Sequence, residues 1–308
     1  MNESFFHSFA CMGTEVKFQV VEPVARLHDA ARDAAIARAV DWFHQVESAC
    51  NRFDETSELR QLCAQPGVAV AASEILFEAV QFAVAVADAS DGAFDPTVGA
   101  RMEARGFDRD YRTGVSTRSF LHHDESHHDH SASYDEIELD IRTQTITLHK
   151  PLLLDLGAVA KGLAIDMAAR ELAPLHNFMV NAGGDLYVGG HNTQDERWHV
   201  GIRHPRMTDT FVHTLRASNC AVCTSGDYER VGADGAHHLM DARNSAPAES
   251  LASVTVTAPS AMVADALATA AFALGPSKGL EFLASHEVEG LLIAPTLERW
   301  TTPGMILD

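Results

Sequence analysis

Apolar residues recur at helical spacing in several stretches of the chain. Positions three or four residues apart give a helix one buried face. Ser73 and Ser260 stand directly before two of these stretches, and serine is a residue type that caps helix N-termini. The helices that the pattern predicts cover about 27–49, 57–63, 73–88, 161–172, 261–274 and 277–284.

Other stretches alternate apolar and polar residues, which is typical of half-buried strands. The apolar run Leu152–Leu154 predicts entry into a further buried strand, and 91–99, with two glycines, a proline and two acids, predicts a rigid non-helical loop. The alternating stretches predict strands at 15–21, 136–141, 145–148, 178–181, 186–188, 198–203, 210–215, 221–224, 237–241, 254–258 and 291–294. Strands grouped apart from helices indicate an α+β fold with mixed or antiparallel sheets.

The chain has 308 residues, of which 46% are hydrophobic, as in an ordinary globular protein. We expect a single domain over 1–308, built as two intimate subdomains. The composition shifts at about 108–133, an expected insertion in which acidic residues accompany His122, His123, His127, His128 and His130. A tract of this kind either binds a transition metal or is a solvated insertion, and we expect the second.

A formal net charge of −20 argues against nucleic acid and anionic membranes as partners. The sequence has no apolar run long enough to span a membrane. The first residues also lack the basic and apolar regions of a signal peptide. We therefore expect a cytoplasmic location, or a periplasmic one if a leader peptide was removed.

The five cysteines are too few, and odd in number, for a disulfide framework. Cys220 and Cys223 form a C-x-x-C pair, but the surrounding pattern predicts a strand rather than a helix N-terminus. Residues three apart on a strand face opposite sides. This arrangement argues against a redox or zinc role for the pair.

The stretch from Leu152 to Asp166 combines an acid, a glycine turn and a predicted helix start. Asp155 precedes Gly157, and Lys161 follows within the first helical turn. A helix N-terminus with a nearby lysine suits a phosphate group. The spacing differs from a P-loop, where the lysine directly follows the second glycine. A plain strand–turn–helix junction remains the alternative.

Two further sets of polar residues offer chemistry. Asp265 and Thr269 lie four apart in a predicted helix that is otherwise apolar, so both project from one face. Their oxygens suit Mg²⁺ or Ca²⁺, although the helix dipole also favours an acid in an early turn, and Thr hydroxyls often bond back to the helix. His238 stands near Asp241, and a histidine whose unperturbed pKa lies near neutrality can act as a general base. The chain has 17 histidines, so an inert role stays open.

Taken in order, these segments resemble the ApbE family of FAD:protein FMN transferases. The resemblance covers most of the chain, and the agreement of many short motifs in register makes it specific. The matching segments are Met12–Thr14, Ala93–Gly99, Leu154–Gly162, Val180–Asp185, Thr224–Tyr228, His238–Asp241 and Ala264–Thr269.

The resemblance implies an ApbE-like fold and a Mg²⁺-dependent enzyme, although another divalent ion remains open. It implies transfer of FMN from FAD to a Thr or Ser hydroxyl of a target protein, with release of AMP. By the same resemblance, Asp265 and Thr269 would bind the metal through side chains and Ala158 through its carbonyl. Asp265 and His238 would be catalytic, with His238 deprotonating the acceptor. The positions that match FAD-contacting residues are Met12, Ala93, Phe94, Asp95, Asp155, Lys161 and Met240.

The acceptor implied by the resemblance carries an Asp-Gly-x-Thr/Ser-Gly motif. This chain lacks that motif, so we expect it to be the modifying enzyme. Three departures from the family pattern, at Ala100, Arg105–Phe107 and Ala242, affect the expected rim of the flavin pocket. Two alternatives remain: a Mg²⁺-dependent FAD pyrophosphatase that yields FMN and AMP, and a non-catalytic flavin or metal carrier.

Overall fold

The computed structural model describes residues 2–23, 30–110, 113–117, 133–229, 237–244 and 246–305. The histidine-rich tract at 122–130 lies outside these ranges, as does the predicted start of the first long helix. Among the described residues, no helix is both long and apolar enough to cross a membrane.

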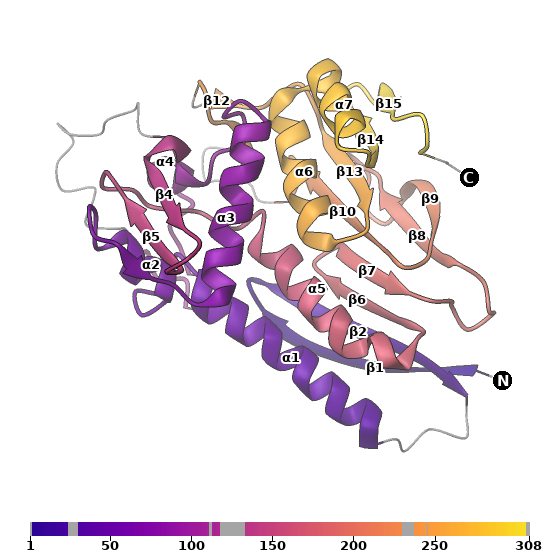
Figure 1. Ribbon diagram of the computed structural model, residues 1–308. Coiled ribbons are helices and arrows are strands. Elements are labelled where there is room, and N and C mark those ends of the chain that lie inside the picture. Colours follow the sequence, from indigo (N-terminus) through magenta and orange to yellow (C-terminus); the bar gives the residue numbers. More distant parts are fainter. Residues whose placement is uncertain are drawn as a thin grey trace.

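An antiparallel sheet of eight strands forms the centre of the fold (Figure 1), in the order β1-β2-β6-β7-β10-β13-β14-β15. All of its neighbouring strands pair antiparallel, which matches the predicted α+β class. The strands are β1 (Asn2–Cys11), β2 (Thr14–Pro23), β6 (Phe178–Ala182), β7 (Asp185–Gly189), β10 (Cys220–Gly226), β13 (Ser253–Ala258), β14 (Glu289–Ile293) and β15 (Arg299–Thr301).

Helices cover one face of this sheet (Figure 1). They are α1 (Ala30–Cys50), α5 (Ala160–Leu172), α6 (Ala261–Leu274) and α7 (Pro276–Ser285), and α3 (Glu74–Ala89) packs against α1 and α6. Helix α5 packs between α1 and α6, and α6 packs on β10 and β13. One core cluster joins these helices to the sheet, from Cys11 in β1 to Leu292 in β14. This continuity supports the one-domain organisation, which remains a prediction.

A hairpin of β8 (Trp198–Arg203) and β9 (Phe211–Ala217) covers the opposite face of the sheet. Its apolar side chains form a second core with residues of β2, β7, β10 and β14. Strand β10 separates the two cores: Cys223 belongs to the first, whereas Cys220 packs against the second. The predicted opposite orientation of the C-x-x-C pair is therefore confirmed.

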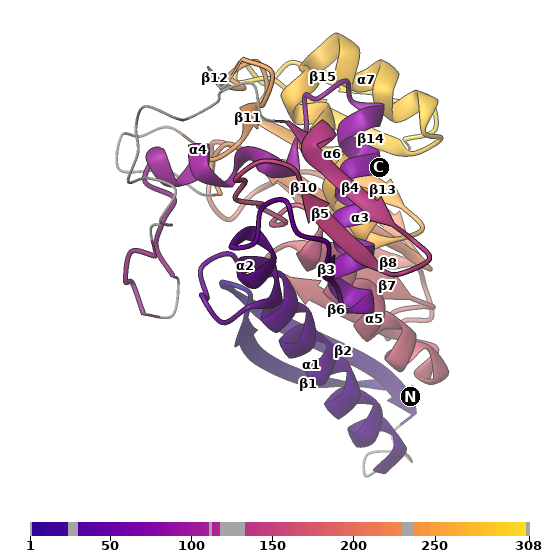
Figure 2. The same cartoon turned by 60° about the vertical axis from the view of Figure 1, so that its left-hand side comes forward.

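A small sheet of β3 (Val70–Ala71), β5 (Thr145–Leu148) and β4 (Ile137–Asp140) lies beside α2 (Glu58–Cys63) and α3 (Figure 2). It contains the predicted hairpin. The remaining elements are the short helix α4 (Gly99–Ala104), the 3-10 turns η2 (Pro96–Val98), η4 (Tyr134–Glu136) and η5 (Ala173–Leu175), and the two-residue strands β11 (Met240–Asp241) and β12 (Ala246–Pro247).

Three local predictions were wrong. Leu152–Leu154 is buried but forms no strand: Leu153 accepts from the backbone N–H of Gly99, and Leu154 donates its N–H to Cys63 Sγ, so neither residue bonds to a sheet. Segment 91–99 is not wholly non-helical, since η2 and the start of α4 fall within it. The strand predicted at 237–241 is reduced to β11.

Strand β1 was missed, although β1 pairs with β2 along its whole length. Its burial largely alternates, but its sequence, in which Phe5 and Phe6 are adjacent, lacks the strict apolar–polar alternation that predicts a strand. The two-residue β3 and the three-residue β15 were also missed, since segments that short carry no period. Most helix bounds were predicted to within a few residues.

Candidate active site

A cavity of about 600 Å³ opens where α1, α5 and α6 meet the loops that follow β1, α3 and β10. Its volume is in the range of small-molecule sites in proteins. All the residues that the sequence predicted for the active site line this one cavity. They are Met12, Ala93, Phe94, Asp95, Asp155, Ala158, Lys161, His238, Met240, Asp265 and Thr269.

Lys161 lies at the start of α5, with its ammonium group between two carboxylates. It donates to Asp265 Oδ2 at 2.8 Å and also to Asp185 Oδ2. Burial by itself lowers the pKa of Lys161. The charges of Asp185 and Asp265 raise it by more than burial lowers it, so the pKa lies above the ordinary value. The lysine therefore remains a cation deep in the cavity.

Two hydroxyl groups adjoin this charged cluster. Ser225 Oγ, at the end of β10, lies 2.9 Å from Thr269 Oγ1 on α6. Thr269 follows Asp265 by one helical turn, so α6 presents a carboxylate and a hydroxyl to the cavity together. Carboxylate and hydroxyl oxygens are hard ligands of the kind that Mg²⁺ prefers.

The first turn of α5 is held against the first turn of α6 by a close backbone contact. A Cβ added at Gly162 would lie 2.5 Å from the carbonyl oxygen of Ala261, so glycine is required there. Asp166, one turn further along α5, accepts hydrogen bonds from the backbone N–H groups of Ala261 and Met262 at 2.7 and 2.9 Å. The helix that carries Lys161 thus fixes the helix that carries Asp265.

Asp155 is held by a buried arginine rather than capping the helix that follows. Arg52 Nε donates to Asp155 Oδ2 at 2.7 Å, and its Nη2 donates to the carbonyl oxygen of Phe107 at 2.6 Å. The other Asp155 oxygen accepts from the N–H of Gly157 at 2.8 Å. These contacts fix the loop that leads into α5.

Asp95 directs one carboxylate oxygen into its own loop, and the other accepts from the backbone N–H of Tyr134 at 3.3 Å. Its Oδ1 accepts from the backbone N–H of Thr97 at 2.8 Å and from the Thr97 hydroxyl at 2.7 Å. Burial raises the pKa of Asp95, and the hydrogen bonds from Thr97 act against that rise. The backbone of Ala93 also accepts a bond from Ala242, which follows Met240 and Asp241, so the loop and β11 are joined. This joins two chain-distant segments of the cavity wall.

The structure separates two adjacent histidines. His238 is half-buried and lines the cavity, and its ring centroid lies 6.3 Å from that of Phe107. The His237 ring packs instead against Phe272 of α6, with 5.8 Å between centroids. Burial lowers the pKa of His237. Of the two, His238 is placed to meet a ligand.

Sequence reasoning assigned no role to three residues of the site: Asp185, Arg52 and Glu47. Asp185 ends the segment Gly183-Gly184-Asp185, where it accepts from the backbone N–H of Thr224 at 2.8 Å as well as from Lys161. Its presence inside a matching motif was a usable signal. Arg52 and Glu47 lie in or just after a helix and carried no comparable signal.

The chain matches known proteins along most of its length. A family model described as the ApbE family matches residues 12–292. The FAD:protein FMN transferase of Treponema pallidum is 31% identical over 307 residues, which cover 92% of this chain and 82% of the relative. That of Haemophilus influenzae is 29% identical over 272 residues, which cover 84% of this chain and 75% of the relative.

Solved structures agree with the fold. The ApbE protein from Thermotoga maritima is similar with a TM-score of 0.82 and 26% identity, covering 98% of this chain and 97% of that chain. The flavin transferase ApbE from Vibrio cholerae is similar with a TM-score of 0.84, covering 98% of both chains. At 23% identity, the similarity to this second structure shows a shared fold only.

Proposed function

The chain belongs to the ApbE family, and on that basis we propose that it transfers the FMN part of FAD to a protein. The acceptor is a Thr or Ser hydroxyl in an Asp-Gly-x-Thr/Ser-Gly motif. The observation that carries the proposal is the cluster of Lys161, Asp185 and Asp265 beside Thr269, at the helix N-terminus that faces the cavity. Cavity and cluster together suit a ligand with a pyrophosphate.

A divalent cation fits this cluster by the chemistry of its donors. Asp265, Thr269 and the carbonyl of Ala158, the ligands that we propose, all offer oxygen, and all line the cavity. When bound, Mg²⁺ would neutralise pyrophosphate charge and orient the phosphorus that is attacked. Lys161, kept charged by its two carboxylates, adds a second positive group at the same place.

The chain's own residues then have separate tasks. The apolar part of the cavity, with Phe94 and Met240, takes the flavin side of FAD, while Lys161 and the start of α5 attract the phosphates. The acceptor hydroxyl oxygen bonds to the phosphorus on the FMN side. The bond from that phosphorus to the bridging oxygen breaks, and AMP leaves with that oxygen. His238 takes the proton of the hydroxyl.

The test is intact-mass spectrometry of an acceptor protein that carries Asp-Gly-x-Thr-Gly, incubated with this protein, FAD and Mg²⁺. We expect the acceptor to gain the mass of one FMN, and EDTA to prevent the gain. The variant Asp265→Asn keeps the shape of the side chain but loses its charge, so transfer should slow by on the order of 100-fold.

Asp209→Asn is the matched control. Asp209 is an exposed carboxylate outside the cavity with φ of 59°, a conformation that asparagine tolerates, and its loss should leave the rate unchanged. FMN and AMP appearing free in solution, with no gain in acceptor mass, would instead establish the pyrophosphatase. Full activity of folded Asp265→Asn would reject the proposed metal site.

A further inference from the structure

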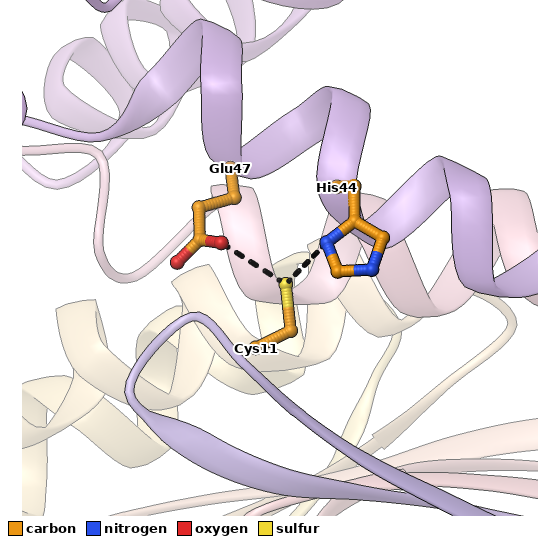
Figure 3. A group of neighbouring side chains, drawn as sticks. All are labelled: Cys11, His44 and Glu47. Atoms are coloured by element: carbon orange, nitrogen blue, oxygen red, sulfur yellow. Dashed lines mark hydrogen bonds between the residues drawn. The ribbon is translucent and has the colours of Figure 1, made fainter. Parts of the chain in front are cut away.

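A second group of metal-binding side chains lies apart from the oxygen cluster, where β1 ends against α1. Figure 3 shows His44 and Glu47 reaching from α1 toward Cys11. Cys11 Sγ lies 3.8 Å from His44 Nδ1 and 3.3 Å from Glu47 Oε2. The three ligand atoms all lie within 4.8 Å of one another. Sulfur, nitrogen and oxygen donors thus converge on one point.

These separations are close to those of a tetrahedral zinc site. Zinc binds sulfur at about 2.3 Å and nitrogen or oxygen at about 2.0–2.2 Å, so tetrahedral ligand atoms lie roughly 3.5 Å apart. The two measured distances from Cys11 Sγ, 3.8 and 3.3 Å, lie on either side of that value. The side chains need only small rotations to share an ion.

The carboxylate of Glu47 also accepts a hydrogen bond from a residue outside this group of three. Glu47 Oε1 accepts a hydrogen bond from the backbone N–H of Met12 at 3.0 Å, which leaves Oε2 directed at Cys11. Ligating carboxylates in metal sites are oriented by such bonds. Met12 and Gly13 form the tight turn between β1 and β2, with φ of 52° and 76°, a type I′ geometry.

The three side chains differ in burial, so the sulfur is protected from solvent while one side of the group stays accessible. Cys11 is fully buried, Glu47 is half-buried and lines the cavity, and His44 is exposed. An ion can therefore arrive from solvent on the side of His44. The donor set also separates this group from the Asp265 cluster, since a thiolate selects soft or borderline ions and an oxygen cluster selects hard ones.

We propose that Cys11 Sγ, His44 Nδ1 and Glu47 Oε2 bind a Zn²⁺ ion, with water in the fourth position. Binding releases the thiol proton, because the thiolate is the ligand. The bound ion links the β1–β2 turn to α1. Since Met12 and Glu47 also line the large cavity, the zinc site stiffens one wall of it. Zinc binding at this site does not require the proposed transferase activity.

Cobalt substitution tests the site in the full-length protein. Co²⁺ takes zinc ligands, and a cobalt–thiolate bond gives a near-ultraviolet charge-transfer band that histidine and carboxylate ligands do not produce. We expect the wild-type protein to develop this band with a single Co²⁺ per chain, and Zn²⁺ to displace it. The tract at 122–130, which has no cysteine, cannot produce such a band.

Matched variants assign the ligands. Cys11→Ser should abolish the cobalt–thiolate band, whereas Cys220→Ser should keep it. Cys220 serves as the control because it is the one cysteine that is not buried. His44→Gln, at an exposed position, should weaken Co²⁺ binding at least tenfold, roughly the scale on which metal-site mutations act. His199→Gln, an exposed histidine on β8, should not.

Three results would overturn the proposal that these residues bind zinc. A folded wild-type protein that gives no band at 100 µM Co²⁺ has no thiolate site of useful affinity. A band that persists in Cys11→Ser, or one that is unaffected by His44→Gln, would place the metal elsewhere. Far-ultraviolet circular dichroism establishes that each variant is folded, so a lost band reports the ligand and not unfolding.

Discussion

Lys161 shows how one residue gains its properties from its surroundings. A buried lysine would ordinarily tend to lose its proton, but here two carboxylates from β7 and α6 raise its pKa above the ordinary value. The ammonium, in turn, allows Asp185 and Asp265 to lie close together. Cation and carboxylates are therefore one unit, and removing any member changes the charge of the cavity.

At the same scale, His238→Ala should lower the transfer rate by about 100-fold or more while changing FAD affinity little, because a general base acts on the acceptor hydroxyl and not on FAD. Steady-state transfer rates and a direct FAD titration separate the two effects. His237→Gln is the matched control, since that ring packs on Phe272 outside the cavity lining. Equal losses in both variants would contradict the assignment of the base to His238.

Arg52→Ala should reduce the free energy of unfolding by about 2–3 kcal/mol, because it leaves the partly buried Asp155 without its cation. Urea unfolding measures the loss. Arg52→Lys keeps the charge but not the two-directional guanidinium, so it should cost about 1 kcal/mol. FAD affinity should fall in both variants, because the loop before α5 is no longer held. A loss as large for lysine as for alanine would show that geometry, and not charge, matters.

At the scale of elements, α5 is the part on which the site depends. It contacts α1 on one side and α6 on the other, and its backbone approaches α6 closely at Gly162. Asp166 caps the start of α6, and Ser260 Oγ donates to that same carboxylate at 2.6 Å. Because one helix positions the other, Lys161 and Asp265 meet without depending on loop conformation.

The contact of α5 with α1 gives a pH prediction. Glu171 accepts from Arg38 Nε at 2.7 Å and from Trp42 Nε1 at 3.2 Å, and these bonds lower its pKa below 4.5. The stabilisation is complete above pH 4.5 and is lost as the pH falls through the folded-state pKa.

Glu171→Gln should therefore cost about 0.5–1 kcal/mol at pH 7, since the pair is partly exposed. The difference from wild type should stay constant down to about pH 4.5 and shrink below it. Urea unfolding of both proteins across this pH range provides the check. If the difference in free energy of unfolding between wild type and Glu171→Gln grew as the pH fell, the ion pair could not be its cause.

At the scale of the whole molecule, the cavity is built from segments that span most of the chain, from Met12 to Ala273. A ligand held there stabilises the folded chain as a unit. Mg²⁺ or FAD at about 100 times its dissociation constant adds roughly 2.7 kcal/mol, which raises the melting temperature by about 5 °C.

Thermal unfolding with each ligand alone and with both tests this coupling. Asp265→Asn should lose the shift caused by Mg²⁺ and keep part of the shift caused by FAD. The Asp209→Asn control should show both shifts, because its carboxylate lies away from the cavity lining. A full Mg²⁺ shift in Asp265→Asn would place the cation at another site.

The sequence alone determined the features that depend on local patterns, namely the positions of helices and many of the site residues. Helical periodicity located α3, α5 and α6, since burial of one face leaves a mark every three or four residues. Motifs in register identified many of the residues that line the cavity, but not Glu47 or Arg52, which belong to no such motif. The same local logic failed at Leu152–Leu154, where packing, one backbone bond from Gly99 to Leu153 and one bond from Leu154 to the Cys63 sulfur satisfy the run without a sheet.

Only the tertiary structure decided which distant side chains meet. Lys161 reaches Asp185 and Asp265 because α5, β7 and α6 pack together, and Arg52 reaches Asp155 across a long stretch of chain. Cys11, His44 and Glu47 converge only because β1 ends against α1. Such pairings arise from the packing of whole elements, and packing distances between segments far apart in the chain leave no periodic trace in the sequence.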